Sequence, residues 1–229
     1  MKKYRLLFKM SAVLSYLFFV FGLYQLTSIV QNYWQFSSQV GNIFWIQNVL
    51  SLLFSGVMIW ILVKTGYGYL FRIPRKKWLW YSILTVLVAV VHISFNIQTA
   101  RYVQSTAEGW AVLIGYSGTN FAELGIYIAL FFLVPLMEEL IYRGLLQHAF
   151  FKHSRFGLDL LLPSILFALP HFSSLPSLLD IFVFTTSGII FAGLTRYTKS
   201  IYPSYAVHVI NNIFATLPFL LTFLHRVFG

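Results

Sequence analysis

The chain places two adjacent glutamates and an arginine inside an apolar run, "FFLVPLMEELIYRGLL", at residues 131–146. On membrane-insertion scales, a charged side chain at the centre of a membrane helix costs about 2.5–3.5 kcal/mol. Glu138, Glu139 and Arg143 therefore need a reason to be there. Inside a membrane span such residues face the protein interior or a polar cavity, and they mark a candidate functional site.

The spacing of these charges predicts separate roles for the two carboxylates. At about 100° per residue on an α-helix, Glu139 and Arg143 (i, i+4) lie on one face and can form an ion pair. Glu138 lies on a different face from Arg143. We expect the arginine to hold one carboxylate while the other is free for chemistry. The alternative is that all three side chains form a polar clamp between helices.

Two further polar pairs have the same i, i+4 spacing. "FALPHF" contains Phe167 and His171, with Pro170 directly before the histidine, and "YAVHVINN" contains His208 and Asn212. Proline inside a span frees a backbone carbonyl, which is tolerated where the helix lines a cavity or finds partners. A single membrane histidine usually serves as a hydrogen-bond partner between helices. Two histidines, an asparagine and a free glutamate on three helices instead favour one shared site.

The composition identifies the elements that must position these residues. The 229 residues are 59% hydrophobic and only 10% charged, whereas a soluble domain has about 25% charged residues. The chain is therefore an integral membrane protein. It has no cysteine, which excludes disulfides, a thiolate nucleophile and a cysteine metal site. Its net charge of +10 does not indicate nucleic-acid binding, because the basic residues cluster at the ends of apolar runs.

About 20 apolar residues are needed to cross a bilayer as a helix. Spans are predicted at residues 10–30, 43–63, 78–98, 121–147, 158–172, 178–197 and 201–225, the fifth and sixth being short or interrupted. The first is expected to be an uncleaved span, because its apolar run is longer than that of a signal peptide and no A-x-A site closes it. The sequence thus predicts an all-α, polytopic membrane helix bundle of about seven spans with a polar intramembrane cavity.

Basic residues alternate between the two ends of these spans and predict the orientation. One side carries Lys2, Lys3, Arg5, Lys9, Lys64, Arg72, Arg75, Lys76, Lys77, Arg143, Lys152, Arg155, Arg196 and Lys199, and the other only Arg101 and Arg226. Cytoplasmic loops are enriched in Lys and Arg. The protein is therefore expected in the cell membrane with its N-terminus cytoplasmic and, if there are seven spans, its C-terminus outside.

The three polar segments resemble a known family. "EELIYRG", "FALPH" and "HVINN" are similar, in order and spacing, to the EExxxR, FxxxH and HxxxN motifs of the CPBP intramembrane proteases. This family, also called Abi, includes CAAX prenyl endopeptidases and bacteriocin-processing or immunity proteins. The resemblance covers about residues 121–215. It implies a catalytic core in 121–229, preceded by N-terminal spans of unclear role in 1–120.

The resemblance also implies roles for individual residues. Glu138 and His171 would activate a water for attack on a peptide carbonyl, and His208 and Asn212 would donate hydrogen bonds to the tetrahedral oxyanion. A positioned glutamate can act as a general base, and donors aimed at a developing oxyanion gain strength where water is scarce. The supporting residues would be Glu139, which is also the alternative base, Arg143 and Phe167.

A metal ion is the rival account of the same residues. Glu138, His171 and His208 with an open position could hold a catalytic zinc or another divalent metal. The sequence has no H-E-x-x-H motif, and Asn212 is a poor zinc ligand. These features favour hydrolysis without a cofactor.

The predicted function is an intramembrane endopeptidase that cleaves near the C-terminus or leader of a small peptide or membrane-associated protein. Its partners would be that substrate and the lipid bilayer, and no nucleic acid. One alternative is a bacteriocin immunity or regulatory membrane protein that acts by binding. A proton-coupled transporter would use the same polar residues as a relay, but no inverted repeat of the kind common in transporters is visible.

Several polar residues match none of these motifs. We expect the histidines among them to be packing or interfacial residues, and the two acidic residues have no explanation from the sequence. They are His92, His148, His153, His225, Glu123 and Asp180.

Overall fold

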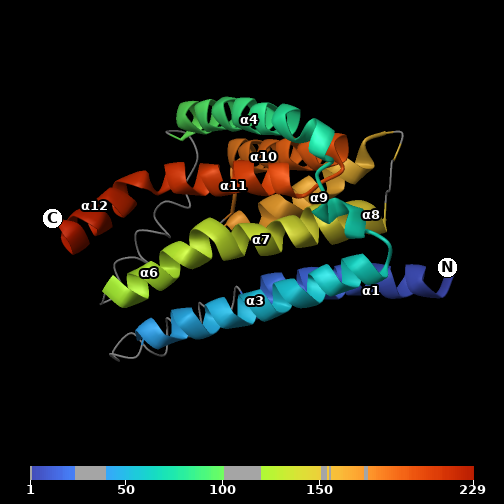
Figure 1. The fold of residues 1–229 in the computed structure, drawn as a ribbon, viewed down its shortest axis with the longest axis horizontal. Helices are drawn as coiled ribbons and strands as arrows, with labels where there is room; N and C mark the ends of the chain where they lie inside the picture. The colour runs from blue at the N-terminus through green and yellow to red at the C-terminus, as the bar shows by residue number, and fades with distance from the viewer. Residues whose placement is uncertain (1, 24–39, 101–119, 151–153, 155, 173–174) are drawn as a thin grey trace.

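The computed structural model of the chain describes residues 2–23, 40–100, 120–150, 154, 156–172 and 175–229. Within these residues the regular structure is helical, with no strand. The prediction of an all-α bundle is therefore confirmed for the described part of the chain. Figure 1 shows long helices lying side by side, with the two termini at opposite ends of the view.

The N-terminal half contributes three long apolar helices. Helix α1 (Lys2–Leu17) continues into a π-helical turn, η1 (Phe18–Leu23), and is followed by α3 (Val40–Lys64). Two 3-10 turns, η2 (Gly68–Phe71) and η3 (Arg75–Lys77), lead into α4 (Trp78–Thr99). Helix α3 stops because Gly66 adopts a φ of +92°, a left-handed conformation that glycine allows at a helix end.

The next apolar helix runs without interruption from Asn120 to Ala149 and is called the central helix here. Its parts are α6 (Asn120–Ile128), η4 (Ala129–Leu133), α7 (Val134–Glu138), η5 (Glu139–Leu146) and α8 (Gln147–Ala149). Both η4 and η5 are π-helical. A π-helical turn widens the helix locally, and it is rare overall but common at functional sites. The glutamates and the arginine of the sequence motif therefore lie where the helix widens.

The C-terminal part packs four further helices around the central one. They are α9 (Leu158–Ala168) with the 3-10 turn η6 (Leu169–His171), α10 (Leu178–Thr198), α11 (Tyr202–Ala215) and α12 (Leu217–Phe228). Helices α9 and α10 approach closely, since a Cβ atom at Gly188 would lie 2.8 Å from the Cα of Ser164. Glycine at this position is therefore required by packing.

Four helices of the described residues are long and apolar enough to cross a membrane. They are Phe44–Lys64, Arg75–Thr99, Asn120–Ala149 and Leu178–Thr198, which match the second, third, fourth and sixth predicted spans. The protein is an integral membrane protein, and these helices indicate several crossings. The count of seven spans is not confirmed, because the predicted span 10–30 lies partly outside the described residues and Leu158–His171 is a short apolar helix.

The predicted span over residues 201–225 consists of two apolar helices. The structure divides this segment into α11 and α12, which are bent by 69° relative to each other. Thr216 leaves the helical conformation at φ −110° and ψ 10°. Pro218 follows in the first turn of α12, where its missing N–H and its ring prevent continuation of the preceding helix. The two helices together are apolar enough for one span, with a sharp bend in the middle.

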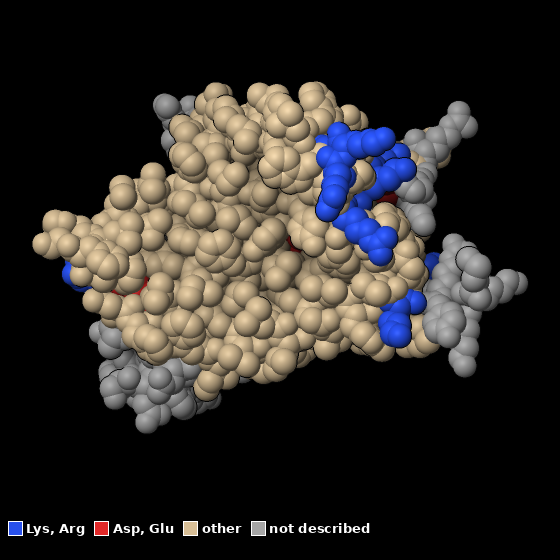
Figure 2. Space-filling view, viewed as in Figure 1, with Lys and Arg blue, Asp and Glu red and all other residues tan. Residues whose placement is uncertain are grey.

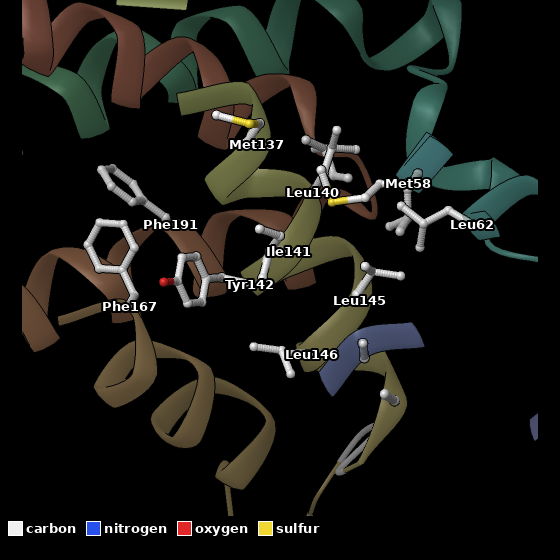
Figure 3. Close-up of a cluster of buried hydrophobic side chains, with 14 of the residues drawn as sticks. Met58, Leu62, Met137, Leu140, Ile141, Tyr142, Leu145, Leu146, Phe167 and Phe191 are labelled. Carbon is white, nitrogen blue, oxygen red and sulfur yellow. The ribbon is translucent and has the colours of Figure 1, made fainter. Parts of the chain in front are cut away.

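The central helix occupies the middle of the bundle. Its apolar stretch is 67% buried inside the protein, compared with 17–44% for the other three membrane-crossing helices. Figure 3 shows Met58 and Leu62 of α3 on one side of it and Phe167 and Phe191 on the other, with the Tyr142 ring directed toward the two phenylalanines. Side chains of the central helix can thus reach α9, α10 and α11.

Lysine and arginine side chains gather at the end of the bundle where α4 begins (Figure 2). The described residues of this basic end include Arg72, Arg75, Lys76, Lys77, Arg196 and Lys199, as the charge pattern predicted. Arg101, Lys152 and Arg155 lie outside the described residues. The assignment of the basic end to the cytoplasm stays a prediction.

Candidate active site

His208 of α11 lies between the two adjacent glutamates of the central helix. Its Nε2 is 3.3 Å from Glu138 Oε2, and its Nδ1 is 3.2 Å from Glu139 Oε1. All three residues are buried, with exposed fractions of 5% for Glu138, 0% for Glu139 and 4% for His208. A neutral imidazole has one N–H, so two such contacts need a further proton on the ring or on one carboxylate. The cluster is therefore able to hold and pass a proton.

Arg143 neutralises one of these carboxylates. Its Nη1 lies 3.5 Å from Glu139 Oε1, which confirms the predicted i, i+4 pair. Its Nη2 donates to the backbone carbonyl of Gly188 at 3.4 Å. The guanidinium lies 4.6 Å from the ring centroid of Phe167 and 5.1 Å from that of Phe191, and such faces attract a cation. Phe167 and Phe191 thereby help to hold a buried charge.

Glu138 differs in part from its prediction. It forms no ion pair with Arg143 among the described residues, as expected from its different face. It is not free, however, because it contacts His208. The reason is that the two ring nitrogens of an imidazole lie on different edges, so one histidine can reach carboxylates on two faces of the helix.

His171 is fixed beside this cluster through Phe167. The Nδ1 of His171 donates to the Phe167 carbonyl at 2.8 Å, since a carbonyl can only accept, and its Nε2 is then the acceptor in the neutral ring. The Phe167 ring lies 4.7 Å from the ring of His171 and 5.8 Å from that of His208. The described residues show no ion pair between His171 and either glutamate.

Asn212 lies one helical turn after His208 on α11. Its Nδ2 donates to the backbone carbonyl of Leu130 at 3.0 Å, within the π-helical turn η4. This bond uses one of the two amide hydrogens and orients the other. Asn212 and His171 are both partly exposed, in contrast to the buried Glu138 and His208. They mark the accessible side of the cluster.

Phe191 is a member of the site that sequence reasoning missed. Its ring stacks on His208 with centroids 4.8 Å apart and an interplanar angle of 19°. The ring of His92 lies 5.0 Å from that of Phe191. The chain has 24 phenylalanines, and no motif distinguishes this one from the rest.

A second polar network joins α4 to the helices that hold the site. His92 is fully buried, and its Nε2 lies 2.9 Å from the Ser187 hydroxyl of α10. Asn96 donates to the side-chain carbonyl of Asn211 of α11 at 2.7 Å. His92 is therefore more than a packing residue. The i, i+4 spacing of His92 and Asn96, the same as in the other motifs, was a signal for this network.

The remaining polar residues have structural roles. Glu123 forms an ion pair with Arg226 and accepts from the Tyr127 hydroxyl at 3.3 Å. Asp180 accepts from the Ser177 backbone N–H at 2.8 Å in a capping box that starts α10. His148 donates to the Arg143 carbonyl at 2.8 Å. His153 lies outside the described residues.

The metal alternative rests on Glu138, His171 and His208. In the part of the chain that is described, no group of three or more His, Asp or Glu side chains is arranged to hold a metal ion. The Nδ1 atoms of His208 and His171 contact the Glu139 carboxylate and the Phe167 carbonyl, which are partners that metal-binding histidines also use. Hydrolysis without a metal therefore stays a prediction.

The cavity visible in the structure is separate from this cluster. It has a volume of about 540 Å³ and lies at the basic end, and none of the predicted site residues lines it. Access to Glu138 and His208 is therefore expected from the side of His171 and Asn212, which are partly exposed.

The segment that contains these residues matches a known protein family. Residues 119–214 match the sequence model described as type II CAAX prenyl endopeptidase Rce1-like. The matched segment contains Glu138, His171, His208 and Asn212 and excludes α4. No curated protein and no solved structure matches the chain significantly. Residues 119–214 are thus similar to the Rce1-like type II CAAX prenyl endopeptidase family, which confirms their resemblance to the CPBP intramembrane proteases.

Proposed function

We propose that the chain is an intramembrane endopeptidase of the CAAX type. It hydrolyses a peptide bond near the C-terminus or the leader of a small peptide or membrane-associated protein. The observation that carries the proposal is the position of His208 between Glu138 and Glu139, inside the segment that matches the endopeptidase family. In this proposal, residues 121–229 form the catalytic core and the basic end faces the cytoplasm.

The first chemical step is the activation of water. Glu138 accepts a proton from a water molecule while the water oxygen bonds to the peptide carbonyl carbon. The Nε2 of His171 is suited to orient this water, because its Nδ1 is committed to Phe167. Glu139 remains ionised beside Arg143. When the C–N bond breaks, the proton on Glu138 passes to the departing amine, which completes the hydrolysis.

The second step is stabilisation of the oxyanion. The Nε2–H of His208 donates to Glu138 before the reaction, and a carboxyl group that has taken a proton is a weaker acceptor than a carboxylate. Proton transfer to Glu138 therefore releases this N–H for the oxyanion. Asn212 supplies its second amide hydrogen, because the first is held by Leu130. Preorganised donors of this kind are typical of acyl-transfer sites.

Buried polar atoms without hydrogen-bond partners support the proposal that water binds in the cluster. Glu139 Oε2, Arg143 Nε and the Tyr142 hydroxyl are buried and have no hydrogen-bond partner among the described residues. Buried polar atoms in proteins are nearly always paired, with protein or with water. These atoms are suited to hold water next to Glu138, where the proposed hydrolysis consumes it. The proposal uses no metal ion.

The experiment that tests this function uses purified protein in lipid vesicles with a synthetic prenylated CAAX peptide as the probe. Wild type is expected to release a shorter peptide of defined mass, and Glu138→Ala is expected to release none. The peptide without its prenyl group distinguishes recognition of the lipid from recognition of the peptide. If wild type leaves both probes intact, cells with wild type and with Glu138→Ala are compared for any peptide whose mass changes. No difference in either assay would contradict the proposal.

The family resemblance also covers immunity proteins, and we propose that any such protection by this chain requires catalysis. A binding partner has no need for two carboxylates, a histidine and an asparagine inside the membrane, where polar groups are costly. Cells with Glu138→Ala or His208→Ala at wild-type membrane levels would be challenged with a peptide toxin against which wild type protects. Full protection by both variants would mean that the protein acts by binding.

A further inference from the structure

The cavity of about 540 Å³ at the basic end is formed by parts of the chain that are distant in sequence. Its walls come from the segment before and at the start of α4, the end of the central helix, the start of α9 and the end of α10. The lining residues are Tyr69, Arg72, Pro74, Lys77, Tyr81, Gln147, His148, Asp159, Thr195, Arg196, Thr198 and Lys199. The proposed endopeptidase chemistry uses none of them.

The cavity is strongly basic. Arg72, Lys77, Arg196 and Lys199 line it together with a single acidic residue, Asp159, so the formal charge of the lining is four minus one, or +3. Asp159 is committed to Arg196, with 3.2 Å between Oδ1 and Nη1. Among the described residues, Arg72, Lys77 and Lys199 have no carboxylate partner. Three cations therefore line one cavity without a carboxylate partner among the described residues.

The surroundings of the cavity indicate the level of the membrane interface. Trp78 and Trp80 at the start of α4 are 62% and 51% exposed, and Tyr197 of α10 is 61% exposed. The Trp80 indole donates to the Tyr197 hydroxyl at 3.3 Å. Exposed Trp and Tyr are typical of the membrane–water interface. The cavity is therefore at the depth of lipid headgroups.

The bias of basic residues toward the cytoplasm accounts for charge at this end, but it does not account for a cavity. It also does not explain why three of the cations that line the cavity have no carboxylate partner among the described residues. We propose that the cavity binds the phosphate group of an anionic glycerophospholipid. The bound headgroup joins the start of α4 to the end of α10, the two helices whose polar side chains meet behind His208.

The test uses full-length protein in nanodiscs of phosphatidylcholine with increasing phosphatidylglycerol, and native mass spectrometry counts the retained anionic lipids. The cavity variant is Arg72→Gln with Lys199→Asn, because Lys199 has a φ of 55° that asparagine tolerates. The matched control is Arg75→Gln with Lys76→Gln, which removes the same charge from exposed residues of the same end that do not line the cavity. We expect the cavity variant to lose about tenfold more affinity than the control, since hydrogen bonds to charged groups are the strong ones.

A second measurement separates the possible sources of phosphate. Phosphatidylglycerol is expected to raise the unfolding temperature of wild type and of the control pair, but not that of the cavity pair. Equal losses in both pairs would mean general attraction to a basic surface and would overturn the proposal. Stabilisation to the same extent by inorganic phosphate in pure phosphatidylcholine would overturn the lipid assignment. If the cavity pair does not fold, Lys77→Gln replaces it, with an expected loss of about threefold.

Discussion

The central helix has two buried acidic sites, and they differ in what surrounds them. Near its start, Glu123 is 2% exposed and is paired with Arg226 and Tyr127. The Arg226 side chain is 51% exposed, so water reaches the cation of this pair. One carboxylate, one cation and one phenol satisfy each other and join α6 to α12. Nothing in this group requires more than a structural role.

The middle of the same helix has a different arrangement. Glu138, Glu139, Arg143 and His208 have exposed fractions of 0–5%, and two carboxylates share one permanent cation. The histidine must bridge both carboxylates, and buried polar atoms remain without partners. Such a group is costly in a membrane and contributes little net stability. The presence of this buried group therefore favours a catalytic role over a structural one. Glu123 provides an internal control for every test of Glu138.

The largest expected effect is on turnover. Glu138→Gln preserves the shape of the side chain but removes the base, and we expect kcat to fall by about 10²–10⁴-fold. Glu123→Gln, the same change on the same helix, should leave kcat within about twofold because it touches no reacting group. Turnover of one peptide by both variants, at equal membrane levels, measures the contrast. Near-normal turnover by Glu138→Gln would show that the base is misassigned and would remove the distinction between the two sites.

Stability should give the next largest contrast. Arg143→Ala leaves Glu139 buried without its permanent cation, with only His208 as a partner, and breaking a buried pair in this way costs about 3–5 kcal/mol. Arg226→Ala exposes its partner to water, so a cost of at most about 1 kcal/mol is expected. Thermal unfolding in detergent and abundance in the membrane measure both variants.

A double variant sharpens this second test. Glu139→Gln combined with Arg143→Met removes both charges and should recover much of the stability lost in Arg143→Ala, because replacing a buried pair is less costly than breaking it. If Arg226→Ala destabilises as much as Arg143→Ala, the two clusters do not differ in the way that their burial indicates.

These contrasts depend on features that the sequence predicted to different degrees. Helical spacing was sufficient to pair Glu139 with Arg143, because an i, i+4 relation is local. It was also sufficient to place Phe167 and His171 on one helix face, and His208 and Asn212 on one face of another helix. The apolar runs predicted four membrane-crossing helices at the observed places. Local pattern and hydropathy therefore predicted most of the fold and the ion pair between Glu139 and Arg143.

The contacts between helices could not be obtained in this way. The bridge from His208 to both glutamates depends on the rotation and depth of α11 against the central helix, which no single helix encodes. The stacking of Phe191 on His208 has the same origin. The break at Thr216 was missed because hydropathy continues through it, although Pro218 was a signal. Contacts between helices are determined by tertiary packing, which sequence periodicity does not encode.

The network from α4 should have a smaller effect than either cluster. His92→Leu removes the partner of Ser187 beneath Phe191 and should lower kcat by about tenfold, since a lost buried hydrogen bond costs about 1–3 kcal/mol. KM should stay unchanged, because His92 acts through Phe191 and touches no substrate group in the proposed mechanism. His92→Gln should restore part of the rate by keeping a hydrogen bond to Ser187.

Ser94→Ala is the control for this prediction. Ser94 is exposed on the same helix and its hydroxyl donates only to the Val90 carbonyl, so the change should leave kcat and KM at wild-type values. Steady-state kinetics with one peptide compare the three variants. A loss of folded protein in His92→Leu without recovery in His92→Gln would mean that α4 contributes packing alone.

The smallest expected effect is that of metal removal, which should change turnover by less than about twofold if the metal-free mechanism holds. A histidine that binds a metal needs a free ring nitrogen and uses the other for an outer partner. In this structure both nitrogens of His208 face carboxylates, and Asn212 is bonded to Leu130.

Glu123→Gln protein can be treated in parallel, because it shares the fold and differs only at the structural ion pair. Turnover is measured after dialysis against a chelator, and metal content is measured on the same samples. About one zinc per active chain, lost together with activity and restored with it when zinc is added back, would contradict this prediction. In that case, the Nε2 of His208 would have to leave Glu138 to bind the metal, while its Nδ1 could keep Glu139 as the outer partner.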